Sequence, residues 1–234
     1  MTKMSRTTAS DEIYEVLRNE ILSLRFLPGQ EVNLNSLAEQ LNCSRSPVRD
    51  ALMKLDRDNL VDIYPQKGTR VSLIDLHQVE EERFLRKSLE LSALVRFIKV
   101  ANASDYYKME AAIESQKLAI EKDDYTAFFD ADDAFHKVAF EAIGKNWCWS
   151  LVSSQSGNYH RIRLLSFQLS SVTDNILTQH RQILSFIKEK REEELVALMN
   201  IHLEKLDNEV NQLTEKYKAY FKFDLKKKSI KLKI

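Results

Sequence analysis

The sequence predicts a mainly α protein: an N-terminal winged helix-turn-helix followed by a C-terminal all-helical bundle of about six helices. Three observations lead to this expectation. The 234 residues include only four glycines and three prolines, too few turn formers for a sheet-rich fold with many tight hairpins. Apolar residues recur at helical spacing over most of the chain. Before the C-terminal tail, a strand pattern occurs once, as a short hairpin over residues 60–73.

The composition provides both a core and a charged surface, with 44% apolar and 30% charged residues. Lys and Arg together number 35, as do Asp and Glu, so net charge offers no argument for a nucleic-acid partner. Two cysteines exclude a disulfide framework and a cysteine-based zinc site. We expect a cytoplasmic protein, because the N-terminus lacks the apolar segment of a signal peptide and no stretch approaches the ~18 apolar residues of a membrane span.

Residues 1–75 are predicted to form the winged helix-turn-helix domain. The expected elements are a helix capped by Ser10 and ended by Pro28-Gly29, a helix from Asn35 to about Asn42, a helix that starts at Ser46-Pro47, and strands at 60–64 and 69–73. Pro suits the first position of a helix, and Pro-Gly is a strong helix terminator. Two helices, a tight turn, a third helix and a hairpin within about 75 residues are the layout of a winged helix-turn-helix.

Residues 76–222 are predicted to form the helical domain, and residues 223–234 a basic tail. Helical periodicity extends over six segments, near 76–102, 104–121, 123–143, 147–170, 174–190 and 192–221. Such a series of amphipathic segments with short breaks is typical of a helix bundle. The tail alternates apolar and basic residues, which is typical of a solvated tail, with an edge strand or a non-specific anion contact as alternatives.

The stretch from residue 37 to residue 61 carries the strongest functional pattern. Arg45 and Arg49 lie four residues apart, on one face of the third helix, and Ser44 or Ser46 can cap its start. A helix N-terminus with two arginines suits phosphate contact and bidentate recognition of guanine in the major groove. A structural helical hairpin with solvated arginines is the alternative that spacing alone leaves open.

This region resembles the DNA-binding domain of the GntR family of bacterial transcription regulators. The matching motifs are Leu27-Pro28-Gly29, Leu37-Ala38-Glu39, Ser44-Arg45-Ser46-Pro47-Val48-Arg49-Asp50-Ala51-Leu52 and Lys67-Gly68-Thr69-Arg70-Val71. The resemblance implies that Arg45 and Arg49 contact bases or phosphates and that Ser44 and Ser46 donate to phosphate. It also implies a wing in which Lys67 and Arg70 contact phosphate and Gly68 lets the backbone approach the minor groove. Family members often carry Gly at positions 42 and 59, where this chain has Asn, the next most tolerant residue of left-handed backbone.

Four residues of the helical domain form a candidate metal site. Asp132 and His136 are four residues apart, so both project from one helical face. His180 and His202 each lie beside an apolar stripe on a later helix. One carboxylate and three imidazoles suit Zn, Ni, Co, Mn or Fe and leave one or two coordination positions open. Spacing cannot establish that the three helices converge, so satisfied core histidines are the alternative.

Residues 76–221 are similar to the FCD domain, the effector domain of FadR-type GntR regulators. Its metal-binding members carry aspartate-x-x-x-histidine, a histidine before an arginine, and a histidine-leucine pair, matched here by Asp132/His136, His180-Arg181 and His202-Leu203. The resemblance therefore implies a divalent transition metal ion of the Zn, Ni or Mn class. The family motif arginine-x-x-leucine-glutamate appears as Arg86 to Glu90, so Arg86 is expected to hold an effector carboxylate, with a helix-surface ion pair as the alternative. His160, Arg161 and Arg163 are weaker candidates for the same cavity.

These patterns predict a ligand-responsive transcription regulator rather than an enzyme. We expect a homodimeric repressor that binds a double-stranded DNA operator, a metal ion and a small organic acid effector, with no membrane partner. Two alternatives stay open. One is a metal-free acyl-type pocket built from aromatic side chains, namely Phe128, Phe129, Phe135 and Phe140. The other is a metal-dependent hydrolase, although no separate nucleophile or oxyanion motif accompanies the histidines.

Overall fold

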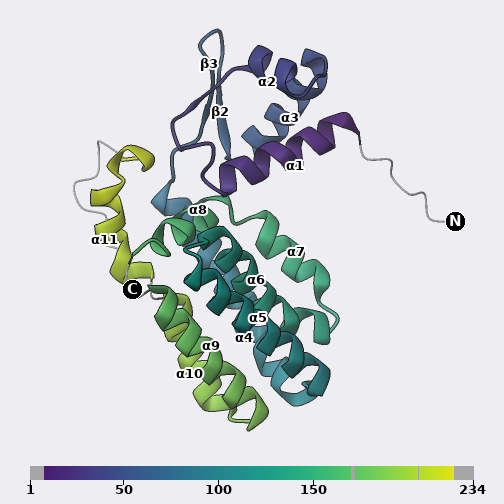
Figure 1. Cartoon of the computed structure of the whole chain (residues 1–234), viewed down its shortest axis with the longest axis vertical. Coiled ribbons are helices and arrows are strands. Elements are labelled where there is room, and N and C mark those ends of the chain that lie inside the picture. Colours follow the sequence, from purple (N-terminus) through teal and green to yellow (C-terminus); the bar gives the residue numbers. More distant parts are fainter. Residues whose placement is uncertain (1–7, 170–171, 205, 224–234) are drawn as a thin grey trace, which may run out of the picture. The chain divides into compact units, whose positions relative to one another are not determined.

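The computed structural model describes residues 8–169, 172–204 and 206–223, which fall into two compact units (Figure 1). The first unit contains the chain up to Gln78 together with residues 216–223, and the second contains Val79–Glu215. Helices dominate, and one small sheet lies in the first unit, so the predicted mainly α fold with an N-terminal winged helix-turn-helix and a C-terminal helical domain is confirmed.

The first unit is a winged helix-turn-helix. Its elements are α1 (Ala9–Leu22), β1 (Glu31–Val32), α2 (Leu34–Gln40), α3 (Arg45–Arg57), β2 (Val61–Tyr64) and β3 (Gly68–Val71). The antiparallel sheet has the order β1-β3-β2, with Tyr64 opposite Gly68 and Glu31 opposite Arg70. Strand β1 is absent from the sequence prediction, because two residues are too few to show an alternating pattern.

Local capping corrects two helix starts. Thr8, rather than Ser10, caps α1: its hydroxyl accepts the Asp11 N–H at 3.2 Å, and the Asp11 carboxylate accepts the Thr8 N–H at 3.0 Å. This reciprocal pair is a capping box. Helix α2 begins at Leu34 because the Asn33 side chain accepts two backbone N–H groups, from Asn35 and Ser36. Each start lies one or two residues before the predicted one.

Helix α3 packs into an apolar core that it shares with α1, α2 and the sheet. Val48, Ala51 and Leu55 are fully buried, and Leu17 and Leu52 are nearly so. The turns that follow α2 and α3 contain Asn42 and Asn59 with φ of 48° and 56°. Asn therefore supplies the left-handed backbone that the resemblance led us to expect at these two positions.

The second unit consists of helices that pack along one another (Figure 1). They are α4 (Leu76–Val100, of which the first three residues belong to the first unit), α5 (Ala103–Glu121), α6 (Tyr125–Ala142), α7 (Asn146–Ser154), α8 (Gly157–Ser166), α9 (Val172–Lys188), α10 (Glu192–Glu204) and α11 (Leu206–Lys216). The described residues thus contain eight helices where about six were expected. The segments 147–170 and 192–221 each divide into two α-helices. Apolar periodicity continues across both breaks, so the pattern could not locate them.

Most of the core of the second unit is apolar, and fully buried side chains such as Phe97, Phe135, Ile183 and Met199 fill the space between α4, α5, α6, α9 and α10. One part of it is polar. Buried beside these residues are charged or polar side chains from several helices, namely Arg86, Glu90, Gln116, Asp132, His136, His180 and His202. Among the described residues, no helix is long and apolar enough to cross a bilayer.

The chain returns to the first unit after α11. A short 3₁₀ helix, η1 (Lys218–Tyr220), leads to Phe221, which pairs in parallel with Ile74. The Ile74 N–H donates to the Tyr220 carbonyl at 2.8 Å, and the Lys222 N–H donates to the Ile74 carbonyl at 2.9 Å. Residues 216–222, which the sequence analysis placed in the helical domain, therefore group with the winged domain. Of the predicted tail, residues 224–234 lie outside the described residues.

We expect Phe221→Ala to lower the free energy of unfolding of the first unit by about 3 kcal/mol, the usual cost of truncating a buried Phe. Phe221 is 2% exposed, whereas Phe223, two residues later, is 49% exposed. Phe223→Ala is therefore the matched control and should cost less than about 0.5 kcal/mol. Urea unfolding followed by an N-terminal-unit probe measures both values. Equal costs for the two variants would contradict the burial of Phe221.

Candidate functional site

The first turn of α3 presents the predicted DNA-contacting side chains to solvent. Ser44 is the N-cap residue but makes no side-chain capping bond, so its hydroxyl is available to a ligand. Arg45, Ser46 and Arg49 are exposed, while Val48 between them is buried in the core. Apolar anchoring on one side therefore turns the two guanidinium groups outward. Arg49 has one weak ion-pair partner, Asp50, at 3.7 Å.

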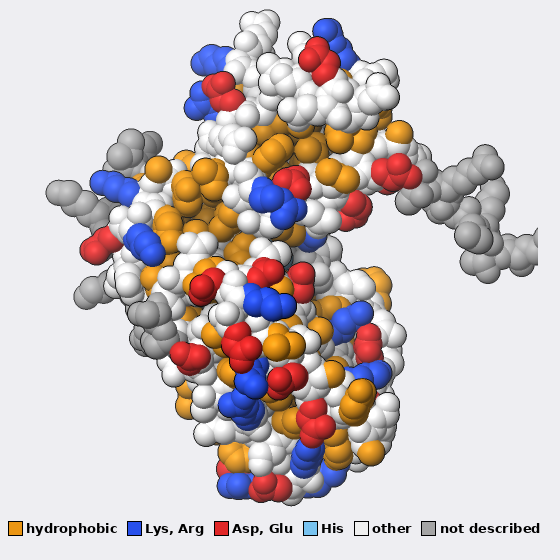
Figure 2. Space-filling view, viewed as in Figure 1, with side chains coloured by type: hydrophobic (Ala, Val, Ile, Leu, Met, Phe, Trp, Pro, Cys, Tyr) orange, Lys and Arg blue, Asp and Glu red, His pale blue; other side chains and the backbone are white. Residues whose placement is uncertain are grey.

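The wing exposes Lys67 and Gly68 at the turn between β2 and β3. Gly68 has φ of 100°, a left-handed backbone that glycine adopts without strain. Arg70 is exposed but donates to the Glu31 carboxylate of β1 at 2.6 Å. On the face shown in Figure 2, Lys and Arg side chains alternate with Asp and Glu, without a large area of one sign. The argument for a DNA-binding surface therefore rests on the local arginines and not on the overall charge.

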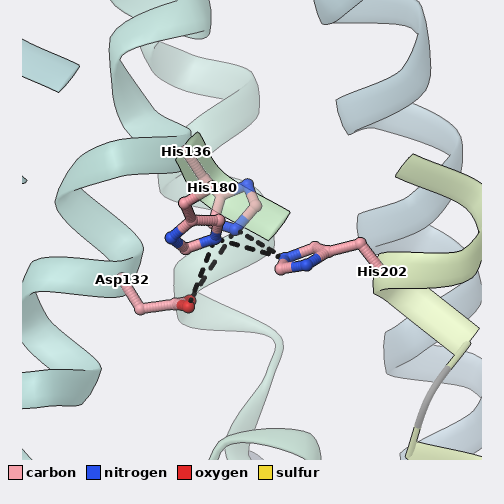
Figure 3. A group of neighbouring side chains, drawn as sticks. All are labelled: Asp132, His136, His180 and His202. Carbon is pink, nitrogen blue, oxygen red and sulfur yellow. Dashed lines mark hydrogen bonds and ion pairs between the residues drawn. The ribbon is translucent and has the colours of Figure 1, made fainter. Parts of the chain in front are cut away.

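Asp132, His136, His180 and His202 converge in the second unit (Figure 3). The first two come from α6, His180 from α9 and His202 from α10, and all four are buried. Their candidate ligand atoms lie within 4.8 Å of one another. His202 Nε2 is 3.3 Å from His136 Nε2 and 3.4 Å from His180 Nε2. The sequence placed only Asp132 and His136 on one helical face. In the structure, His180 and His202 meet them at one point.

A second layer of oxygen atoms orients the three imidazoles. His136 Nδ1 lies 2.9 Å from Glu90 Oε2, His180 Nδ1 lies 2.9 Å from Gln116 Oε1, and His202 Nδ1 lies 2.8 Å from Gln179 Oε1. A proton on each Nδ1 would leave each Nε2 with a lone pair directed at the shared point. Sequence reasoning missed Gln116 and Gln179. The signal for Gln116 was a polar residue at helical spacing from the apolar Met109, Ala112 and Ala119.

The geometry of this cluster fits a transition metal ion. A tetrahedral ion bound to nitrogen at about 2.0–2.1 Å separates its ligand atoms by about 3.3–3.4 Å. The two Nε2–Nε2 distances equal that separation. Asp132 oxygens lie slightly further out, at 3.7 Å from His180 Nε2 and 3.8 Å from His136 Nε2. Three neutral imidazoles and one carboxylate can therefore hold a divalent ion of the borderline class.

Two arginines and two further carboxylates surround the cluster. Arg86 on α4 donates to Glu90 Oε1 at 2.5 Å and to Asp133 Oδ1 at 3.2 Å. Arg163 on α8 donates to the same Asp133 oxygen at 3.2 Å and to Asp132 Oδ2. Arg86 is 3% exposed, so its pairing with Glu90 is a buried ion pair rather than the helix-surface pair considered as an alternative. Charges from α4, α6 and α8 thus form one network.

The network shifts the pKa of its members. Burial alone would raise the pKa of Glu90, but the charge of Arg86, together with the neighbouring His136, lowers it from 4.5 to about 2. Burial likewise opposes ionisation of Asp132, and Arg163 with the neighbouring histidines outweighs it and lowers that pKa. Burial also favours neutral Arg86, yet Glu90 and Asp133 raise its pKa. Both carboxylates and the guanidinium are therefore ionised at neutral pH.

A small cavity that opens to solvent lies directly against this cluster. Its walls are Arg86, Asp132, His136, Tyr159, Arg163, Ser166, Phe167, Ile176, His202, Leu203 and Glu209. Of the weaker candidates from the sequence, Arg163 lines the cavity. Arg161 is not among the lining residues and donates to the Gly157 carbonyl and to Asn158 within its own helix. His160 stacks on Phe129, with ring centroids 3.7 Å apart. The cavity offers a small ligand both charged and apolar surface.

Glu90 should make a pH-dependent contribution to stability. Its lowered pKa means that this contribution is complete above about 4.5 and is lost as the pH falls toward about 2. We expect the difference in free energy of unfolding between the wild type and Glu90→Gln to shrink over that range, because the variant cannot titrate there. Urea unfolding at a series of pH values measures it. Glu80→Gln, an exposed site on the same helix, is the control, and a constant difference for Glu90→Gln would contradict the expectation.

A winged helix-turn-helix joined to a helical domain with an internal ligand cavity defines a class of DNA-binding regulators that sense small molecules. Comparison with known families agrees: the family described as bacterial regulatory proteins, gntR family, matches residues 9–71, and the FCD domain matches residues 83–205. The chain belongs to the GntR family and has the FadR-type architecture, with an FCD effector-binding domain. It is a DNA-binding transcriptional regulator and not an enzyme.

Relatives support this assignment over nearly the whole chain. The HTH-type transcriptional repressor RspR of Escherichia coli K12 is 28% identical over 212 residues, which cover 91% of this chain and 93% of RspR. An HTH-type regulator from Streptomyces ambofaciens is also 28% identical, over 91% of this chain and 89% of its own length. Solved structures share the fold. A putative GntR regulator from Rhodococcus sp. RHA1 is 20% identical, with a TM-score of 0.75, over 90% of this chain and 100% of its own. Escherichia coli McbR/YncC is 18% identical, with a TM-score of 0.74, over 90% of this chain and 99% of its own.

Proposed function

We propose that this protein is a metal-dependent repressor whose FCD domain binds a small organic acid. The observation that carries the proposal is the convergence of Asp132, His136, His180 and His202 on one point. Three of them, Asp132, His136 and His202, also line a cavity. These four residues would hold a divalent ion of the Zn, Ni or Mn class. When bound, such an ion supplies a cationic centre that accepts an anionic oxygen.

The chain's own residues would select and orient the acid. Four protein ligands leave coordination positions open for most ions of this class. Arg86, Tyr159 and Arg163 are among the residues that line the cavity. The guanidinium of Arg163 is itself fixed over the face of Phe129, 4.3 Å from the ring centroid. Rigid donors of this kind favour a carboxylate ligand and limit its orientation.

The winged domain would bind the operator. Arg45 and Arg49 would contact bases or phosphates from the first turn of α3, and Ser44 and Ser46 would donate to phosphate. In the wing, Lys67 and Arg70 would contact phosphate, and Gly68 would allow close approach to the minor groove. A homodimer acting in the cytoplasm on a pseudopalindromic site is the simplest arrangement for one such domain per chain. Repression is proposed because the relative RspR is named as a repressor.

Acid binding must favour one arrangement of the dimer over another if it is to alter operator affinity. The effector can shift that equilibrium only by as much as its affinities for the two arrangements differ. Metal and acid would bind the helical domain, and operator DNA would bind the winged domain. Binding of the acid would change operator affinity through the equilibrium between the two arrangements.

A metal-free acyl pocket is the second candidate, and the aromatic contacts do not favour it. Phe128 packs edge-on against Phe167 at 4.9 Å, and Phe135 stacks on His180 at 4.1 Å. Both are fully buried, as expected of core residues. The cavity beside the histidines has charged groups in its wall, which an acyl chain would have to desolvate.

Elemental analysis of the purified protein, with melting curves before and after chelation, tests the metal. We expect about one divalent transition metal ion per chain and a lower melting temperature once it is removed, because a ligand that binds the folded state stabilises it. Protein free of such metals, with a melting temperature that neither chelator nor added Zn, Ni or Mn changes, would contradict the proposal.

Gln116→Leu should weaken metal affinity by about 10–100-fold, since it removes the acceptor that orients His180. The measurement is competition with a chelator of known affinity. Gln182→Leu, at an exposed position two residues after His180, is the matched control and should leave the affinity unchanged. Equal affinities for the wild type and Gln116→Leu would show that the second layer does not support a metal.

Arg45→Ala should cost ~1–3 kcal/mol of specific DNA binding if Arg45 reads a base. Lys67→Ala should instead weaken binding to all sequences and reduce the salt dependence, as expected for a phosphate contact. An operator selected from random DNA, titrated against an unrelated duplex at several salt concentrations, separates the two effects. Full retention of specificity by Arg45→Ala would contradict the assigned role.

A further inference from the structure

We infer that one exposed face of α4 binds a second copy of this chain, with the two α4 helices antiparallel and related by a two-fold axis at Ser88. The inference deepens the proposed function, which includes a homodimer, and rests on it. Residues at spacings of three and four lie on one side of a helix. The exposed residues of α4 at these spacings form the α4 face, namely Glu81, Phe84, Ser88, Ser92 and Arg96.

The α4 face adjoins an apolar groove between α4, α6 and α7. The groove wall includes Ser92 and Arg96 and the apolar side chains of Leu89, Ala93, Phe140 and Ile143. Phe84 is 72% exposed, and Trp147 at the start of α7 is 74% exposed. Exposed apolar areas bordered by polar residues are typical of protein–protein interfaces, in which Phe and Trp are enriched. This side of the second unit therefore has the character of an interface.

The two ends of the α4 face carry opposite charges. Glu81 lies toward the N-terminal end of the helix and Arg96 toward the C-terminal end. Within the described part of the chain neither residue has an ion-pair partner, whereas Lys99 in the next turn pairs with Glu192 at 3.5 Å. Antiparallel packing of two copies places Glu81 of each copy beside Arg96 of the other. Parallel packing would place like charges together, so the charges select an antiparallel pair.

The same register matches a large side chain with a small one. With a rise of about 1.5 Å per residue, Phe84 and Ser92 lie about 6 Å from Ser88, in opposite directions. A two-fold axis at Ser88 therefore brings Phe84 of one copy level with Ser92 of the other, where the small side chain leaves space for the ring. Glu81 and Arg96 lie about 10.5 Å and about 12 Å from the axis, so these charges are also nearly level. Each contact occurs twice, and the assembly closes at two copies.

Sedimentation of the full-length protein over a range of concentrations tests the α4 face. We expect a dimeric wild type and a dissociation constant about 10-fold higher, or more, for Phe84→Glu, because each dimer would bury two carboxylates without partners. Tyr107→Glu is the matched control, since Tyr107 on α5 is also 72% exposed, and it should leave the constant unchanged. Melting curves show that both variants are folded.

Charge reversal tests the antiparallel register. Glu81→Arg and Arg96→Glu each place two pairs of like charges across the dimer, so each should raise the dissociation constant by about 5-fold or more at low salt. The double variant restores opposite charges and should return the constant to within about 2-fold of the wild type. Glu81→Arg combined with Lys117→Glu, at an exposed position of α5, is the control for net charge and should show no recovery.

The outcomes distinguish this inference from the function on which it rests. A dimeric wild type whose dissociation constant Phe84→Glu leaves unchanged would overturn the α4 face while it supports the homodimer. Single charge variants that dimerise like the wild type, or a double variant that does not recover, would overturn the register at Ser88. A wild type that stays monomeric at every concentration, with and without an operator selected from random DNA, would overturn the homodimer of the proposed function as well.

Discussion

Burial of ionised side chains constrains the second unit, because a charge removed from water must find partners inside the protein. Arg86, Glu90 and Asp132 are each at most 3% exposed, and their partners come from α4, α6 and α8. Apolar residues of similar volume would pack at less cost. A polar centre of this kind beside a cavity is instead what a binding function requires.

The same centre explains why so many helices contribute to one small site. The histidines come from α6, α9 and α10, and their second layer adds Glu90 from α4 and Gln116 from α5. Each partner fixes a ring nitrogen, so the orientation of the ligand atoms depends on helices that carry no ligand themselves. The candidate metal ligands and the packing of the domain are therefore linked through one hydrogen-bonded network.

The path of the chain links this domain to the winged domain at more than one place. Helix α4 leaves the winged unit at its N-terminal end and carries Arg86, which lines the cavity. After α10, which carries His202, α11 leads the chain back to Ile74, the residue that lies between the wing and α4. The chain therefore enters the second unit through α4 and leaves it through α11.

Some features were predictable because they depend on neighbours in sequence. The helix-turn-helix follows from apolar spacing and from Pro47 at the start of α3, and the left-handed turns follow from Asn42 and Asn59. Capping by Thr8 and the two-residue strand β1 were missed, since each depends on one or two hydrogen bonds that leave no periodic pattern. The breaks within 147–170 and 192–221 were missed for the same reason.

The amino-acid sequence by itself determined the family and the helical class, because short motifs and 3.6-residue periodicity can be read from the sequence alone. It also named the four candidate metal ligands. It placed Asp132 and His136 together, as residues of adjacent turns must be. Only the tertiary structure decided that His180 and His202 reach the same point, that Arg86 is buried, and that Asp133 joins it to Arg163. Those contacts join helices far apart in the chain, and their distances are set by packing between helices rather than by spacing along any one of them.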